Sequence, residues 1–327
     1  MKATAYPSLF NPLYVLVTGS LGVFIALTLF IWNYPAPGDT KGQAFVATNA
    51  FAVWVFLFAV LCCLLTVMII PAWGMLIGLF RNRISAEGAD LRRRAIVVLS
   101  LESVFLAIVV FSVLQLIDSF RTGFQFEDYV PRGHGERMTF MYAYAFLTTL
   151  PALLGMALIH ILARHLSEKI ESAGRTESQL FPLIAELLPC RTLLQNYLTI
   201  VGIILSLIPI NTAGLRAILI ALDPQNEQSF PITNAILFGL VFTIFLLLVY
   251  VPAHLALTET SRKLRDRLCP LDSLATLKED MEQRKALDDL LQTNIGIAQN
   301  LKAGFITLSP LIASLIAGVL GINISLP

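Results

Sequence analysis

Three ionisable side chains lie within long apolar stretches of the sequence. Glu102 interrupts the apolar run Ala95–Ile117, and His160 and His254 each lie near the end of another such run. An ionisable group in hydrocarbon is costly and usually serves a function. A carboxylate and imidazoles that meet in a helical bundle can bind a cation or relay protons. The pattern therefore predicts an ion- or proton-binding site formed by Glu102, His160 and His254.

Each of these residues also has a structural explanation. A histidine near a helix end often donates a hydrogen bond to a neighbouring backbone carbonyl or to lipid headgroups, and we favour this explanation for His160. For His254 both explanations stay open. For Glu102 we favour function, because a carboxylate with a purely structural role is hard to stabilise at that depth.

Helical spacing adds polar side chains to the faces that carry the histidines. These polar-stripe residues are Thr149 and Tyr142, which precede His160, and Thr243 and Tyr250, which precede His254. Their separations correspond to whole numbers of helical turns, so each set shares one helix face. Around Glu102 the same face carries only apolar residues. A wide aqueous pore lined by that helix is therefore not expected, whereas a narrow or occluded site is compatible with the pattern.

No catalytic signature accompanies these polar groups. The sequence contains no Gly-rich loop followed by Lys-Ser/Thr, no Gly-x-Ser-x-Gly and no His-Glu-x-x-His. No pair of cysteines or histidines has metal-ligand spacing, and the four cysteines imply no disulfide framework. We therefore expect no catalytic residue, cofactor or metal ion. A net charge of +1 also gives no general attraction to nucleic acid.

The elements that position these residues follow from the composition of the chain. With 56% hydrophobic and 14% charged residues, the chain is too apolar for an ordinary soluble domain. Its apolar runs reach about 20 residues or more, enough to cross about 30 Å of hydrocarbon, and they do not alternate as barrel strands do. The sequence predicts an all-α, polytopic helical membrane protein embedded in a lipid bilayer. The six predicted spans and a seventh segment, which either crosses or re-enters, are Leu13–Trp32, Ala44–Phe80, Ala95–Ile117, Met138–Ala163, Leu194–Leu222, Pro231–Leu257 and Ala303–Leu320.

Charge and proline positions divide the chain into three predicted parts. Residues 1–257 form a bundle of three helical hairpins, 258–302 a charged cytosolic helical segment, and 303–327 the C-terminal membrane segment. Arg164–Arg191 is predicted to be an amphipathic connection between the fourth and fifth spans. Within the fifth span, Pro209 and Asn211 indicate either a broken helix that exposes backbone groups or a simple proline kink. We favour the kink.

Basic residues alternate between the two sides of the predicted bundle. The connections after the second, fourth and sixth spans carry five, four and eight Lys or Arg residues, whereas the intervening loops carry one, three and none. Connections rich in Lys and Arg stay in the cytosol. The sequence therefore predicts a multi-pass protein of the cell membrane, either an inner or a plasma membrane, with a cytosolic N-terminus.

A short heptad-like pattern occurs in the predicted cytosolic segment. Leu287, Leu290 and Asn294 fall at the spacing of core positions in a coiled coil, in which a buried Asn fixes the register. The pattern predicts contacts between protomers of a homo-oligomer. An alternative is that this face docks back on the protein's own bundle, since the pattern is shorter than a typical coiled coil.

Three classes of function remain compatible with these patterns. We favour a small-ion channel or transporter, with proton coupling through the intramembrane carboxylate of Glu102. The alternative is a non-catalytic membrane sensor, effector or assembly subunit that acts through its cytosolic helix. A membrane enzyme that acts on a lipid-like substrate is the least favoured class, because the sequence shows no catalytic constellation.

Overall fold

A computed structural model of the chain describes residues 11–32, 34–123, 129–173, 177–270, 277–291, 293 and 297–324. All regular structure within these ranges is helical, which confirms the predicted all-α class. The elements are α1 (Pro12–Phe30), α2 (Thr40–Val46), α3 (Asn49–Leu79), the π-helix η1 (Phe80–Ile84), α4 (Ser85–Glu87), α5 (Ala89–Gly123), α6 (His134–Ser172), α7 (Glu177–Leu222), α8 (Asn226–Ser229), α9 (Ile232–Leu268), α10 (Leu277–Leu291) and α11 (Ile297–Ile324).

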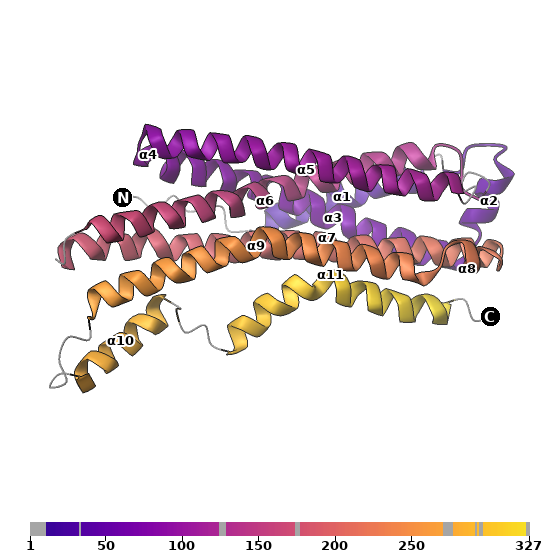
Figure 1. Cartoon of the computed structure of the whole chain (residues 1–327). Coiled ribbons are helices and arrows are strands. Elements are labelled where there is room, and N and C mark those ends of the chain that lie inside the picture. The colour runs from indigo at the N-terminus through magenta and orange to yellow at the C-terminus, as the bar shows by residue number, and fades with distance from the viewer. Residues whose placement is uncertain are drawn as a thin grey trace.

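The long helices lie side by side, with α2 and α8 at one end of the molecule and α4 and α10 at the other (Figure 1). Helix α7 is central, because it contacts α3, α6, α9 and α11, whereas α5 packs mainly on α6. Among the described residues, five helices are long and apolar enough to cross a membrane: α1, α3, α6, α7 and α9. Helix α5 covers the apolar run Ala95–Ile117. The protein is therefore a membrane-embedded helical bundle.

The helices extend well beyond their apolar portions. Helix α6 continues to Ser172 and α7 begins at Glu177, so most of Arg164–Arg191 belongs to these two helices and not to a separate connection. At 46 residues, α7 is about 69 Å long, more than twice the thickness of the hydrocarbon core. Lengths of this kind place the polar ends of α6, α7 and α9 outside the bilayer, at the α10 end of the molecule.

Two proline-containing segments form continuous helices. Helix α7 runs through Pro209, and the side-chain amide of Asn211 donates to the carbonyl of Leu207 (2.9 Å). This geometry agrees with a proline kink and not with a broken helix. Helix α11 likewise continues through Pro310 and packs closely on α7 and α9. A Cβ atom added at Gly239 would lie 2.6 Å from the carbonyl oxygen of Pro310, so a small residue is required there. The C-terminal segment is thus one continuous helix packed on the bundle.

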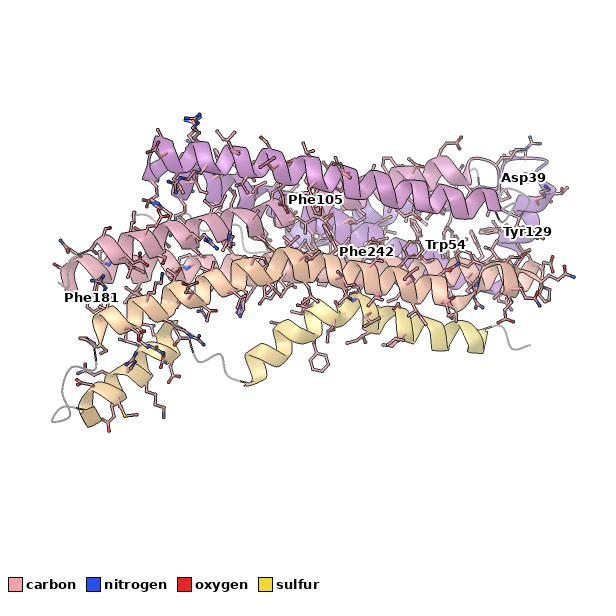
Figure 2. All side chains as sticks on the ribbon, in the orientation of Figure 1. Asp39, Trp54, Phe105, Tyr129, Phe181 and Phe242 are labelled. Carbon is pink, nitrogen blue, oxygen red and sulfur yellow. The ribbon has the colours of Figure 1, made fainter. Side chains whose placement is uncertain are left out.

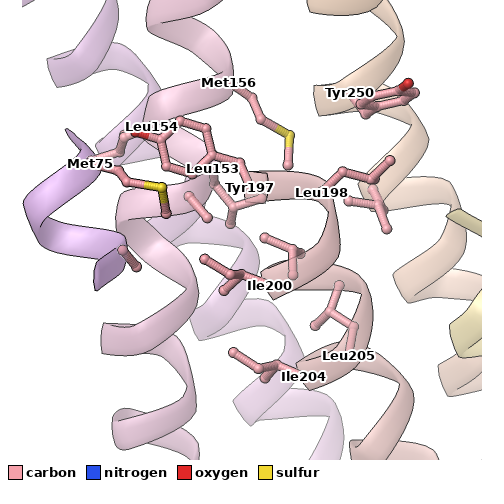
Figure 3. Close-up of a cluster of buried hydrophobic side chains, with 14 of the residues drawn as sticks. Met75, Leu153, Leu154, Met156, Tyr197, Leu198, Ile200, Ile204, Leu205 and Tyr250 are labelled. Atoms are coloured by element: carbon pink, nitrogen blue, oxygen red, sulfur yellow. The ribbon is translucent and has the colours of Figure 1, made fainter. Parts of the chain in front are cut away.

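The centre of the bundle is filled by apolar side chains. Figure 3 shows this cluster, which α3, α6, α7 and α9 contribute and which includes Met75, Leu153, Leu154, Met156, Tyr197, Leu198, Ile200, Ile204, Leu205 and Tyr250. The ring of Tyr197 is fully buried and lies over Gly155, where an added Cβ would be 2.3 Å from its Cε2 atom. The backbone of α6 and the ring of Tyr197 are therefore closely packed at this point.

Candidate functional site

Glu102 lies on the most peripheral of the long helices. Its side chain is half-buried, and its neighbours Leu101, Val104 and Phe105 are exposed on the outer face of α5. Figure 2 places Phe105 on this helix, away from the centre of the bundle. Within the described part of the chain, Glu102 makes no hydrogen bond or ion pair. The residue therefore faces the boundary between α5 and its surroundings, and not a polar interior.

His160 connects α6 to α9 through the backbone. The Nε of Arg164 donates to the Nε2 of His160 (3.1 Å), so this ring nitrogen is the acceptor. The proton assigned by this pattern is on Nδ1, which lies 3.1 Å from the carbonyl oxygen of Pro252 and donates to it. This arrangement uses both ring nitrogens of a neutral imidazole. It corresponds to the structural explanation for His160.

His254 lies on α9, two residues beyond Pro252. Its Nδ1 is 3.2 Å from the hydroxyl of Tyr250, and the two rings stack with centroids 5.4 Å apart. Arg191 of α7 is buried nearby and donates to the hydroxyl of Ser261 (3.0 Å). The two histidines thus lie at different contacts of α9, since His160 of α6 binds the backbone of α9 and His254 lies near Arg191 of α7. No hydrogen bond or ion pair between described residues joins either of them to Glu102.

The polar-stripe residues are directed into helix contacts. Thr149 is buried, and its hydroxyl donates to the carbonyl of Ala145 in its own helix (3.0 Å). Thr243 is 3% exposed, and Tyr142 is partly buried on α6. Tyr250 is occupied by its contact with His254. Thr149, Thr243 and Tyr250 are therefore buried at packed surfaces, and Thr149 and Tyr250 make hydrogen bonds within their own helices.

The proposed oligomer contacts lie on and after α10. Leu287 is partly buried and Leu290 is half-exposed, while Asn294 lies outside the described residues. Leu291 is fully buried, and Asp288 accepts a hydrogen bond from Arg265 of α9 (2.7 Å). This geometry agrees with the alternative in which α10 docks on its own bundle.

Charge holds α10 in this position. Burial raises the pKa of Asp288, but hydrogen bonds from Thr293 and Arg265 outweigh that effect and lower the pKa below its ordinary value. Arg284 of α10 also pairs with Asp266 of α9. The attachment of α10 to α9 therefore combines two polar pairs with the buried side chain of Leu291.

An aromatic cluster around His134 was not predicted from the sequence. His134, at the start of α6, is 1% exposed and lies among aromatic rings from α1, α3 and the segment between them. Its Nδ1 is 2.7 Å from the hydroxyl of Tyr34, and it stacks on Trp54 with centroids 5.9 Å apart. The guanidinium of Arg137 lies over the ring of Tyr34 at 4.5 Å. The other rings in contact with these residues are Phe30, Phe45, Phe51 and Phe58.

Asp39 and Tyr129 extend this cluster into a cap over the α2 end, and Figure 2 labels both there together with Trp54. Asp39 accepts hydrogen bonds from the backbone N–H groups of Gly42 (2.9 Å) and Arg132 (3.0 Å). The hydroxyl of Tyr129 donates to Asp223, beyond the end of α7 (3.1 Å). We call residues 34–54, 129–137 and 223–230 the α2 cap. It joins the ends of α1, α3, α6 and α7.

The α2 cap is expected to weaken in acid because of Asp39. The N–H groups of Gly42 and Arg132 hold the pKa of this carboxyl below its ordinary value of 3.8. Its stabilising contribution is therefore complete above pH 3.8 and disappears as the pH falls through the folded-state pKa. We expect Asp39→Asn to lower the melting temperature at pH 7 and to reduce its dependence on pH between about 5 and 2. Thermal unfolding in detergent at a series of pH values measures both effects, and parallel curves for the two proteins would contradict this prediction.

Ion pairs join the helices at the opposite end. Glu87 of α4 contacts two residues of α6. It pairs with Lys169 and lies 3.3 Å from the Nε2 of His165. Lys263 of α9 pairs with Glu171 of α6 (2.6 Å). The sequence does not single out His165, because its partner Glu87 lies 78 residues away along the chain. These pairs stabilise helix ends that have left the apolar part of the bundle.

Comparisons with protein-family profiles, curated proteins and solved structures found no significant match. Among the described residues, no group of three or more His, Cys, Asp or Glu side chains could hold a metal ion. The arrangement therefore has two polar assemblies, the α2 cap and the charged α10 end. An apolar bundle separates them, with Glu102 on its outer helix.

Proposed function

We propose that this protein is a non-catalytic sensor or assembly component of a cell membrane that acts through its charged α10 end. The observation that carries the proposal is that the long helices are continuous, whereas α10 is a separate helix attached to α9. Helices α6, α7 and α9 run unbroken from the α2 cap to the opposite end. Helix α10, in comparison, is held on α9 by the polar pairs of Asp288 and Asp266 and, among its described residues, buries only one apolar side chain fully, that of Leu291. A displacement of the cap is therefore transmitted by rigid helices to a segment that can be released.

The polar attachment suits a reversible role. The pair of Arg284 with Asp266 reaches solvent, and ion pairs of this kind contribute little stability, typically about 0–1 kcal/mol each, whereas the pair of Arg265 with Asp288 is largely buried. A small change in the spacing of α9 and α10 is thus sufficient to shift the population of docked α10. The apolar core between α3, α6 and α7 supports the same proposal, because it favours rigid transmission over passage of a hydrated ion.

We further propose that the α10 end is cytosolic and the α2 end lies outside, as the distribution of basic residues indicates. We expect cysteines introduced at Ser85 and Ser178 to react with an impermeant thiol reagent only from the cytosolic side. A cysteine at Gln228 should react only from the opposite side. All three positions are exposed in the structure. Reaction of Ser85→Cys and Gln228→Cys from the same side would contradict the proposed topology.

A distance measurement tests the transmission of a change in the cap. Spin labels at the exposed positions Ser178 of α7 and Lys285 of α10 report the docking of α10 in lipid nanodiscs. The half-buried Cys63 is replaced by serine to avoid background labelling. Asp288→Asn should broaden the distance distribution, because it weakens the pair with Arg265. If the cap is coupled to α10, Asp39→Asn should change the distribution as well.

The matched control is Gln228→Ala, at an exposed position of the α2 end. It perturbs the same end without touching the contacts of Asp39, so it should leave the distribution unchanged. Equal distributions for Asp39→Asn and Gln228→Ala would reject the coupling. A distribution that is unchanged by Asp288→Asn would reject the release of α10.

The second candidate function is transport of a small ion, in particular of protons, and Glu102 is the observation that favours it. A half-buried carboxylate without a hydrogen bond or ion pair to the described residues is available to exchange a proton at the edge of α5. We expect purified protein in liposomes to dissipate an imposed pH gradient, and Glu102→Gln to reduce the rate at least about tenfold, as for loss of an essential proton carrier. Ser100→Ala, a nearby exposed change on the same helix, should retain the rate. Wild-type flux no greater than that of empty liposomes would exclude this candidate.

A further inference from the structure

The elbow between α3 and α5 carries a dense group of arginines. The π-helix η1 and the short helix α4 turn the chain there, and Gly88 has a φ of 129° that other residues rarely adopt. Arg81 lies in η1, and Arg92 and Arg93 lie near the start of α5. All three are exposed, and Figure 2 shows nitrogen-bearing side chains that project away from the bundle where α4 and α5 meet.

These three arginines differ from several charged groups at this end, which form ion pairs. Arg94 pairs with Glu168 (3.7 Å), and Glu87 is engaged by Lys169. None of the ion pairs among the described residues includes Arg81, Arg92 or Arg93. The elbow therefore presents net positive charge. Among its exposed side chains in the described part of the chain, only Asp90 carries a negative charge.

Helical spacing places this charge directly beyond apolar surface. Ile96 and Val97 are 46% and 51% exposed, and they follow Arg92 and Arg93, respectively, by four residues on α5. Ile77, which is 58% exposed, precedes Arg81 by four residues at the junction of α3 and η1. Residues four apart lie on one helix face, about 6 Å apart along the axis. Each arginine is therefore one turn beyond a side chain that faces lipid.

We propose that Arg81, Arg92 and Arg93 bind the phosphate of an anionic phospholipid headgroup at the elbow between α3 and α5. Guanidinium groups match phosphate oxygens in bidentate geometry, and their fixed charge does not depend on pH near neutrality. Basic clusters next to the end of a transmembrane helix attract anionic lipids. The apolar residues one turn away contact the acyl chains of the same lipid. Their position favours a lipid as the source of the phosphate over a soluble anion.

Titration of the purified protein with phosphatidylglycerol tests this site. Binding is measured by native mass spectrometry in a neutral detergent. Arg92→Gln together with Arg93→Gln should weaken the affinity about 30-fold, since each basic residue near the surface contributes about 1 kcal/mol. Replacement of the same two residues by lysine should have a smaller effect, because charge remains while bidentate contact is lost. Added salt should weaken wild-type binding, as expected for exposed charges.

The matched control removes the same number of charges at the same end of the molecule. Arg262 and Lys285 are exposed and form no ion pair among the described residues. The residues four positions before them are Thr258 of α9 and Met281 of α10, which do not belong to the apolar surface of α3 and α5. Arg262→Gln with Lys285→Gln should change phosphatidylglycerol affinity less than about twofold, since these charges lie away from the elbow. An equal loss in both double variants, or no loss in either, would overturn the proposal. Glycerol phosphate that binds as tightly as the lipid would assign the site to a soluble anion and would also overturn it.

Discussion

Trp54→Ala is expected to lower the free energy of unfolding by about 3–5 kcal/mol, the range for removal of a large buried aromatic side chain. Trp54 is fully buried and has ring contacts with Phe30, Phe45, Phe58 and His134. Alanine leaves a cavity at the junction of α1, α3 and α6, where rigid ring neighbours cannot collapse around the space. The loss should appear as a lower melting temperature in detergent.

Trp54→Phe is the matched control for this prediction. It keeps an aromatic ring within the cluster and removes only part of the volume, so we expect less than half of the alanine effect. Both proteins should keep the helical content of the wild type before the transition. Equal melting temperatures for Trp54→Ala and the wild type would show that the aromatic cluster does not stabilise the α2 cap.

Gly22→Ala is expected to separate α1 from α3. A Cβ atom added at Gly22 would lie 2.5 Å from the Cα of Cys63 and 2.6 Å from the carbonyl oxygen of Cys62. Both are backbone atoms, so no side-chain rotation relieves the clash and the helices must move apart. We expect a loss of about 1–3 kcal/mol, the usual cost of overpacking, and faster proteolysis of α1. Small residues at helix contacts within membranes permit such close approach.

Gly74→Ala provides the control, because nothing lies within 4 Å of a Cβ added at Gly74, near the C-terminal end of α3. This variant should be neutral or more stable by up to about 1 kcal/mol, since alanine favours the helix. The comparison separates the loss of glycine from the clash. A Gly22→Ala protein as stable as Gly74→Ala would mean that α1 and α3 do not approach as closely as the structure shows.

The fold class and the membrane character were predictable from the sequence because the apolar runs are long. In hydrocarbon every backbone N–H and C=O must be hydrogen-bonded within the protein, so a run such as Ala95–Ile117 becomes a helix. The proline kink at Pro209 was also predictable, since a single proline within an otherwise apolar pattern bends a helix without ending it. Helix ends were less predictable. The charged stretch after Ala163 continues as a helix because its side chains pair with neighbouring helices, which a pattern along one chain does not reveal.

Local pattern determined which residues are costly in the membrane, but tertiary structure decided what they contact. The apolar run around Glu102 identifies this carboxylate as an ionisable group within the membrane. Its place on the peripheral helix α5, in contrast, depends on how the helices pack. His134 has no distinctive local pattern. It becomes the centre of the α2 cap because folding brings it beside Tyr34 and Trp54, 100 and 80 residues away along the chain. The sequence by itself therefore determined which segments form membrane helices and which of their residues are apolar. Only packing decided which polar groups meet, since those contacts depend on helix order and rotation and not on composition.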